Sequence, residues 1–428
     1  MKKREAVILA MMCAAALGNF GNIESAEASA ENGTGKVLEI EKTQEPLRIC
    51  VEEENADVLC QVITAWQKMY DGGQAELLVI PSGEEASEQK VQEIRKTIAS
   101  GGGPDLFLTE SPNPAWSEPK AVLFSEPEKE MEQGTFLSLE PYLEYFDTGL
   151  LEERILAAGR SREEQMMLPM TYDYFLYAFD TEDLPQNTEL PETWEELIVQ
   201  KEKVIRQTAG QRIGIQFFDT FGKLADYEKG ELLLSENQLK KALDGAAEFG
   251  SASLKMDWKM RDTGVVSLNT IEEIAGKKAA HTLFALPNGE GGVTANITLY
   301  AGINKNTKQP KKAVSFLQVL YSEEILSGKG IDLDGRMEGS GVKFSQGVSI
   351  YKNDLEKRIR SLSKEDQEQM KMIQERITAV RFYSELDGNL NALLAEYGAQ
   401  SDEKQKDALV KTAMQKWKNS VSYTHLRA

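Results

Sequence analysis

Residues 166–180 read MMLPMTYDYFLYAFD, and this stretch decides how we interpret the rest of the chain. It is apolar and aromatic, whereas acidic pairs, Glu163–Glu164 and Glu182–Asp183, flank it on both sides. The run is too short and too polar to span a bilayer. Its alternating aromatic residues, with Pro169 near the start, predict a strand entered from a loop. We expect the chain to pass here from one α/β domain to another and to form one wall of the cleft between them.

The segments before this stretch alternate between strand and helix patterns. Short apolar runs at residues 47–51, 75–80 and 105–108 predict three strands, and the segments between them carry apolar residues at helical spacing. This order is typical of parallel strands joined by right-handed crossovers. Ligands bind beyond the carboxyl ends of such strands, so we predict that Glu110 lies at a binding site and that Trp116, in the Pro-rich loop that follows, lines it.

The second half of the chain supplies another candidate wall for the site. Residues 212–218 predict a strand, and its end places Phe218 and Asp219 beside the ligand. The C-terminal part predicts mainly helices, and residues 370–380 place four apolar side chains on one helical face. The whole pattern indicates an α/β fold with a helical C-terminus.

Length and charge restrict the class of protein. A chain of 428 residues predicts two domains of roughly 150–200 residues each. The 49 Lys and Arg residues are outnumbered by 69 Asp and Glu residues, which gives a formal charge of −20. Such a chain repels phosphate backbones and anionic lipids, so we expect neither nucleic acid nor a membrane surface as a partner.

The N-terminus predicts export. Basic residues 2–4 precede an apolar segment and an A-x-A site at residues 28–30, which is the layout of a signal peptide covering residues 1–30. Residues 31–45 predict a flexible leader. We expect a secreted or cell-surface protein without a membrane span. Met12 precedes Cys13 where a small residue would be typical, so we do not expect a lipid anchor at Cys13.

The sequence lacks the motifs that phosphate binding, metal binding and triad catalysis require. The glycines at 101–103 are not followed by the Lys-Ser/Thr of a phosphate-binding loop. His281 has no Cys or His at metal-ligand spacing, and no pattern indicates a catalytic triad. We therefore predict no metal, no cofactor and no catalytic residues. Cys50 and Cys60 are expected to be buried free thiols.

Four segments together resemble a known family. They are GGGPDLFLTE at residues 101–110, LPMTYDYFLYAFD from 168, LPETWEEL from 190 and AGINKNTKQPKKAVSFLQVLYSEE from 301. In this order they resemble the extracellular solute-binding proteins of bacterial ABC importers, particularly the carbohydrate-binding group that includes maltose-binding protein. The resemblance implies a bilobal, periplasmic-binding-protein-like (type II) fold whose two α/β domains are joined by hinge crossovers.

The resemblance also implies a domain division and partners. Lobe 1 would comprise residues 46–168 and 297–332, and lobe 2 would comprise residues 169–296 and 333–420, with an irregular tail at 421–428. A monomer would trap a small-molecule solute between the lobes by hinge closure and deliver it to the transmembrane subunits of an ABC permease.

The segments that resemble the family imply a set of ligand-binding residues. Tyr172 and Asp173 lie at the crossover, and Asn269 and Thr270 lie where a predicted strand at residues 265–268 gives way to a helix. The full predicted set is Glu110, Trp116, Tyr172, Asp173, Phe218, Asp219, Asn269 and Thr270.

The class of ligand is open at this point. A sugar or oligosaccharide would stack on the aromatic residues and bond to the polar ones. A cationic solute such as a polyamine or peptide would pair with Glu110, Asp173 and Asp219. A secreted glycan-active enzyme would need two catalytic carboxylates, which no pattern singles out. A surface module that has lost transport would keep an open cleft.

Overall fold

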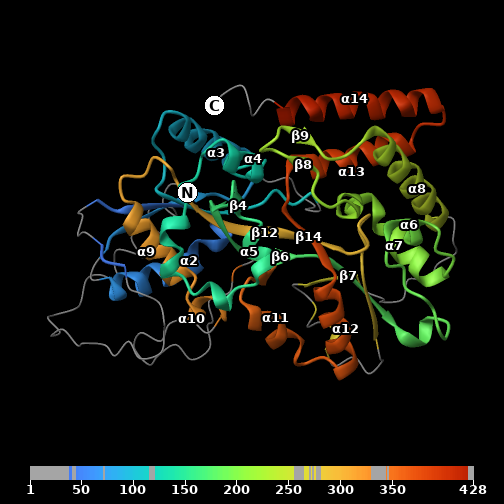
Figure 1. Cartoon of the computed structure of the whole chain (residues 1–428), viewed down its shortest axis with the longest axis horizontal. Helices are drawn as coiled ribbons and strands as arrows, with labels where there is room; N and C mark the ends of the chain where they lie inside the picture. The colour runs from blue at the N-terminus through green and yellow to red at the C-terminus, as the bar shows by residue number, and fades with distance from the viewer. Residues whose placement is uncertain are drawn as a thin grey trace.

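The computed structural model describes most of the chain after the predicted signal peptide and leader. The described residues are 38–40, 45–70, 73–114, 121–254, 265–268, 271, 274–275, 281–328, 344 and 347–422. They form two main sheets with helices packed around each, and two small two-stranded hairpins. The helices α2 and α9 lie at the opposite end of the molecule from α6, α7 and α8 (Figure 1). We call the elements around the larger sheet lobe 1 and those around the smaller sheet lobe 2.

Among the described residues, lobe 1 contains a seven-stranded sheet. Its order is β13-β6-β12-β3-β1-β2, and β14 also pairs with β12. β1 is parallel to both β2 and β3, which confirms the predicted crossovers, whereas β12 is antiparallel to β3 and β6. The strands are β1 Leu47–Glu52, β2 Ala75–Ile80, β3 Leu106–Glu110, β6 Met167–Asp173, β12 Val293–Ile303, β13 Val348–Ser349 and β14 Ile377–Phe382.

Helices of lobe 1 bury one apolar face against this sheet. The helices α2 and α9 also pack on each other: the Trp66 and Phe316 rings meet edge to face at 5.7 Å, and the Trp66 indole donates to Ser315 Oγ at 2.9 Å. The helical elements are α2 Glu53–Met69, α3 Glu84–Ala99, α4 Pro127–Glu132, η1 Glu140–Tyr145, η2 Thr148–Leu150, α5 Glu153–Ala157, α9 Pro310–Leu320 and α10 Glu323–Leu326, with a small hairpin of β4 Arg160–Ser161 and β5 Glu164–Gln165.

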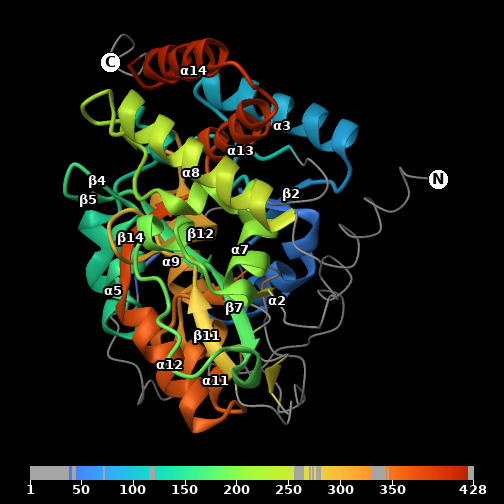
Figure 2. The same ribbon diagram turned by 90° about the vertical axis from the view of Figure 1, so that its right-hand side faces the viewer.

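Lobe 2 is built on a three-stranded sheet, β10-β7-β11, within the described residues. Helices α11 and α12 lie on the opposite side of the central strands from α14 (Figures 1 and 2). The elements are β7 Phe175–Asp180, η3 Thr181–Asp183, α6 Trp194–Ile198, α7 Lys203–Gln216, η4 Phe217–Thr220, β8 Ala225–Asp226, β9 Glu231–Leu232, α8 Glu236–Leu254, β10 Val265–Ser267, β11 His281–Ala285, α12 Lys364–Glu375, α13 Glu385–Gly398 and α14 Glu403–Ser422. The helix α11 Lys352–Ile359 contacts β13 and therefore belongs to lobe 1.

The stretch at residues 166–180 is two strands that belong to different sheets. β6 pairs with β12 in lobe 1, and β7 pairs with β10 and β11 in lobe 2. Tyr174 lies between them, so the predicted passage from one α/β unit to the other is confirmed. The Tyr172 and Tyr174 side chains are both buried, and a single residue, Gln374 of α12, bonds to both hydroxyls at 2.9 and 3.1 Å.

Two predicted elements are wrong. Residues 212–218 are not a strand, because α7 continues to Gln216 and η4 follows. The Glu202 carboxylate caps the start of α7 by accepting from the backbone N–H groups of Val204 and Ile205 at 2.6 and 3.1 Å, and this cap favours the helix. Residues 370–380 are not one helix: α12 ends at Glu375, and β14 then pairs with β12.

The predictions about membrane spans, cysteines and the signal peptide can be compared only with the residues that the structure describes. No described helix is long and apolar enough to cross a membrane. Within the described residues no disulfide joins Cys50 to Cys60, and Cys50 is buried as predicted. Cys60 is only partly buried, so the prediction of two buried thiols is wrong for this residue. The predicted signal peptide lies outside the described residues, and the exact lobe boundaries stay predictions.

The bond between Gln374 and the two tyrosines gives a stability prediction. Gln374→Ala should lower the free energy of unfolding by about 2–3 kcal/mol, because two buried hydroxyls lose their partner. Urea unfolding measures the loss. Lys371→Ala, on the exposed side of the same helix, should change it by less than about 0.5 kcal/mol. Adding Tyr172→Phe and Tyr174→Phe to Gln374→Ala should recover most of the loss, and no recovery would contradict this explanation.

Candidate functional site

The structure describes five of the eight predicted ligand-binding residues. Trp116, Asn269 and Thr270 lie outside the described residues. Two of the five, Glu110 and Asp219, lie beside the same strand: Glu110 pairs with Leu299 of β12, and Asp219 bonds to Asn296 of β12. The strand β12 therefore brings together residues that are more than a hundred positions apart in the chain.

Glu110 ends β3 and is fully buried. Asn55 of α2 donates its side-chain amide to Glu110 Oε1 at 3.0 Å, and the Glu110 backbone N–H donates to Glu52 Oε1 at 3.2 Å. The carboxyl ends of β1 and β3 thus form a buried polar layer, at the edge of the sheet where the sequence predicted a site.

Tyr172 and Phe218 pack in the interior. The Phe218 ring contacts the Tyr383 ring edge to face at 5.6 Å. Asp173 is partly exposed, and its Oδ1 accepts from the backbone N–H groups of Tyr174 and Leu268, each at 2.9 Å. Asp173 therefore ties the crossing between the sheets to the end of β10.

Asp219 is a buried acid beside an amide. Asn296 Nδ2 donates to Asp219 Oδ1 at 2.6 Å, whereas Asp219 Oδ2 and Asn296 Oδ1 find no hydrogen-bond donor among the described residues. Burial raises the pKa of Asp219 to about 7, although Arg381 and the Asn296 bond act in the opposite direction. Two adjacent acceptor oxygens are thus available to a donor.

Arg381 and Asp387 form a buried ion pair next to this acid. Arg381 Nη1 donates to Asp387 Oδ1, and Arg381 Nη2 donates to the Phe218 carbonyl at 3.0 Å. The second carboxylate oxygen accepts from the Ser384 backbone N–H at 2.7 Å, which completes a capping box at the start of α13. We call Asp219, Asn296, Arg381 and Asp387 the central polar cluster.

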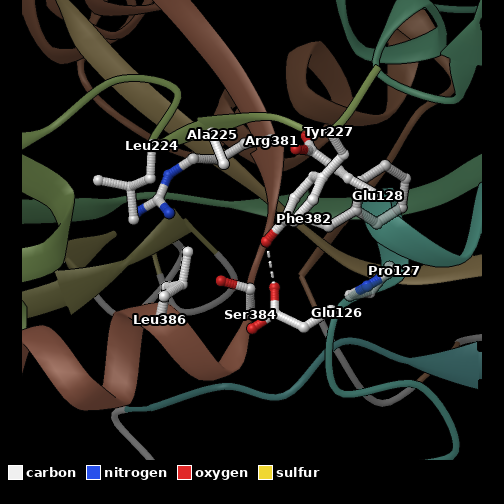
Figure 3. Close-up of a pocket in the computed structure, with 10 residues that line it drawn as sticks. All are labelled: Glu126, Pro127, Glu128, Leu224, Ala225, Tyr227, Arg381, Phe382, Ser384 and Leu386. Atoms are coloured by element: carbon white, nitrogen blue, oxygen red, sulfur yellow. Dashed lines mark hydrogen bonds between the residues drawn. The ribbon is translucent and has the colours of Figure 1, made fainter. Parts of the chain in front are cut away.

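A pocket opens beside the central polar cluster, between α4 of lobe 1 and elements of lobe 2 (Figure 3). It contains about 290 Å³ of space, which includes open solvent. Only about 10 Å³ of this space can hold the centre of a water-sized sphere, so a solute would enter only if the walls move apart. This α4 pocket is lined by Glu126, Pro127, Glu128, Leu224, Ala225, Tyr227, Arg381, Phe382, Ser384 and Leu386.

A hydrogen bond crosses the α4 pocket between the lobes. The Tyr227 hydroxyl, in the loop between β8 and β9, donates to Glu126 Oε2 at 2.5 Å (Figure 3). Burial raises the pKa of Glu126 to about 8, the Tyr227 bond lowers it, and Asp387 and Glu385 raise it further. Burial also raises the pKa of Glu128, 3.9 Å from Lys223. The Glu126 carboxyl in the pocket therefore holds its proton near neutral pH.

Sequence reasoning missed Glu126, Tyr227, Asn296, Arg381 and Asp387. Two signals were available: Asn296 and Arg381 interrupt otherwise apolar strands, and Asp387 stands three residues after Ser384 in a capping-box pattern. Glu126 and Tyr227 gave no such signal, because an acidic, loop-rich stretch usually lies in solvent.

The donor set fits hydrogen bonding to an organic solute. The described residues contain no group of three His, Cys, Asp or Glu side chains that could hold a metal. Hydroxyls from Tyr227 and Ser384, carboxyls from Glu126 and Glu128, and the Arg381 guanidinium supply both donors and acceptors. This combination suits a ligand with many hydroxyl or amino groups.

The fold and an inter-lobe pocket of this kind define a bilobal binding protein. A family model for the bacterial extracellular solute-binding proteins matches residues 54–325. The chain belongs to this family, as the resemblance implied. The family is one of binding proteins and not of catalysts. No curated protein matches the chain.

Solved structures share the bilobal fold at low identity. A periplasmic oligogalacturonide-binding protein from Yersinia enterocolitica is 14% identical, with 89% of this chain and 100% of that chain covered and a TM-score of 0.57. A maltose-bound MalE3 of T. maritima is 15% identical, with 87% and 99% covered and a TM-score of 0.51. A de novo designed cysteine esterase is 14% identical, with 88% and 98% covered and a TM-score of 0.59. Likeness at this identity shows the fold alone.

The buried ion pair gives a second prediction. Arg381→Met should lower the free energy of unfolding by about 3–5 kcal/mol, because Asp387 then stays buried without its cation. Lys90→Met breaks the largely exposed Lys90–Glu93 pair, with 3.1 Å between Nζ and Oε2, and should cost only about 0.5 kcal/mol. Urea unfolding of both variants checks the difference, and equal losses would show that the pair does not contribute as described.

Proposed function

We propose that this protein is the extracellular receptor of an ABC importer and that it captures a sugar or oligosaccharide between its lobes. The proposal rests mainly on the α4 pocket, whose polar side chains come from both lobes. A solute there contacts Glu126 on one side and Tyr227 and Ser384 on the other only when the lobes are closed. Such a solute stabilises the closed state, which a permease can distinguish from the open one.

The polar groups support a polyhydroxylated solute. Sugar hydroxyls both donate and accept hydrogen bonds, so they can serve the carboxyl oxygens of Glu126 as well as the donors of the pocket. Structures with the same fold include proteins described as binding maltose and oligogalacturonide. Of the predicted aromatic residues, Trp116 stays our candidate for stacking on a sugar ring.

The predicted export signal is part of this proposal. A signal peptide at residues 1–30 would deliver the chain outside the membrane, where the receptor meets its solute and the transmembrane subunits of the permease. The lack of a small residue before Cys13 argues against a lipid anchor at that position. A receptor of this kind acts as a monomer and needs no cofactor and no catalytic residue.

A cationic solute is a second candidate because acidic groups gather at the site. Glu128, Asp219 and Asp387 lie around the Arg381 guanidinium, and Glu126 lines the same pocket. A polyamine or a basic peptide would supply the missing positive charge. Glu126→Ala should then reduce affinity more than Trp116→Ala does, whereas stacking on a sugar predicts the reverse order.

A ligand screen tests the proposal. Thermal unfolding of the purified protein should shift upwards with at least one oligosaccharide, since a ligand at a hundredfold over its dissociation constant adds about 2.7 kcal/mol. A shift with polyamines or peptides alone would favour the second candidate. Hydrolysis of a bound sugar would contradict a pure receptor.

A pair of variants tests the place of the site. Tyr227→Phe should weaken binding of the identified sugar roughly fivefold, because one hydroxyl worth about 1 kcal/mol is lost from the pocket. Tyr142→Phe, in η1 of lobe 1, should leave affinity unchanged. Calorimetric titration measures both, and equal affinities in the two variants would place the solute elsewhere.

A further inference from the structure

Glu126 differs from the other acids around the α4 pocket in its partner. Asp387 pairs with Arg381, and Glu128 lies 3.9 Å from Lys223. Glu126 accepts a hydrogen bond from the uncharged Tyr227 hydroxyl through Oε2, and no described residue donates to its Oε1. Oε1 is therefore the acidic oxygen that a solute could reach without breaking an existing ion pair.

Acids and bases both lie around Glu126, and each of the three bases already contacts an acceptor. Lys129 lies on the same helix, but its ammonium donates to the Ser420 carbonyl of α14 at 2.8 Å, and Arg381 is already bonded to Asp387 and the Phe218 carbonyl. The titratable and charged groups facing the pocket are Tyr227 from the β8–β9 loop, Arg381 from β14, Glu385 and Asp387 from α13, Glu128 and Lys129 from α4, and Lys223 from the loop before β8.

We propose that Glu126 selects solutes by charge, so that the α4 pocket accepts a neutral or cationic group and rejects an anionic one. An anion in the pocket would lie against the carboxyl groups of Glu126 and Glu128. The Arg381 guanidinium, whose Nε has no partner among the described residues, already bonds to Asp387 and the Phe218 carbonyl through both Nη atoms. A hydroxyl or ammonium group can instead donate to Glu126 Oε1. The inference rests on the proposed function, since it takes the α4 pocket as the place of the solute.

Proton linkage gives this selection a distinct signature. The pKa of Glu126, about 8, means that the acid is mainly protonated at neutral pH. An ammonium group favours the carboxylate, so its binding releases this proton, and affinity rises with pH by up to about tenfold per unit below pH 8. Above pH 8 the acid is already charged and the dependence levels off. A neutral hydroxyl displaces no proton and gives a much flatter profile.

Calorimetric titration of the full chain tests the charge selection. The probes are neutral trisaccharides of glucose, mannose and galactose, spermidine as the cation, and trigalacturonate as the anion, each at pH 6, 7 and 8. We expect binding of at least one neutral or cationic probe. Trigalacturonate should bind more weakly at pH 8 than at pH 6, because Glu126 is mainly protonated at pH 6 and repels an anion only once it is charged. If spermidine binds, its affinity should rise over this range.

Matched variants connect the selection to Glu126. Glu126→Gln keeps the size of the side chain and an acceptor for the Tyr227 hydroxyl, and it should flatten the spermidine profile, weaken spermidine about tenfold at pH 8 and permit trigalacturonate binding at pH 8. Glu85→Gln, exposed on α3, should leave every titration unchanged.

The possible outcomes bear differently on the charge selection and on the proposed function. Trigalacturonate binding more tightly than every other probe would overturn charge selection but leave a sugar receptor standing. If the affinity for spermidine still rises with pH in Glu126→Gln, another group releases the proton, and this result would overturn the role of Glu126. No binding of any probe would overturn both the proposed function and the charge selection.

Discussion

Burial of β12 along its whole length is the constraint on which the rest of the structure depends. All eleven residues from Val293 to Ile303 are buried, so every backbone donor and acceptor of the strand needs a partner inside the protein. β3 and β6 supply them along the C-terminal half, and β14 pairs with the N-terminal half. Segments from three distant parts of the chain must therefore meet at one strand, and the central polar cluster forms where they meet.

The parts of the fold that depend on local pattern were predictable. The three N-terminal strands and their parallel order followed from apolar runs separated by amphipathic helices, and the aromatic stretch correctly marked the passage between sheets. β14 was not predictable, because its residues also fit a helical face and its partner strand lies about eighty residues earlier in the chain. Residues 212–218 also fit both a strand and a helix pattern, and we predict a strand from the sequence. The structure has a helix there, which a carboxylate cap and tertiary packing favour.

The candidate site shows a similar division. The rule that ligands bind at the carboxyl ends of strands led to Glu110, and the end of a predicted element led to Asp219, although that element is a helix. Asn296, Arg381 and Glu126 become notable only once distant segments pack together, since their importance comes from burial and neighbouring charge. A single sequence shows the kind of side chain but not the dielectric environment that raises its pKa.

The parallel pairing of β12 and β14 has a mechanical consequence. Both strands run in the same direction through the region that joins the lobes, and they are hydrogen-bonded from Val293 to Ile297. Sliding one strand along the other by a residue would break the ladder and turn every side chain to the opposite face. Bending the two-stranded ribbon needs only small dihedral changes spread over several residues. The lobes are therefore expected to rotate about an axis across this ribbon and to resist shear along it.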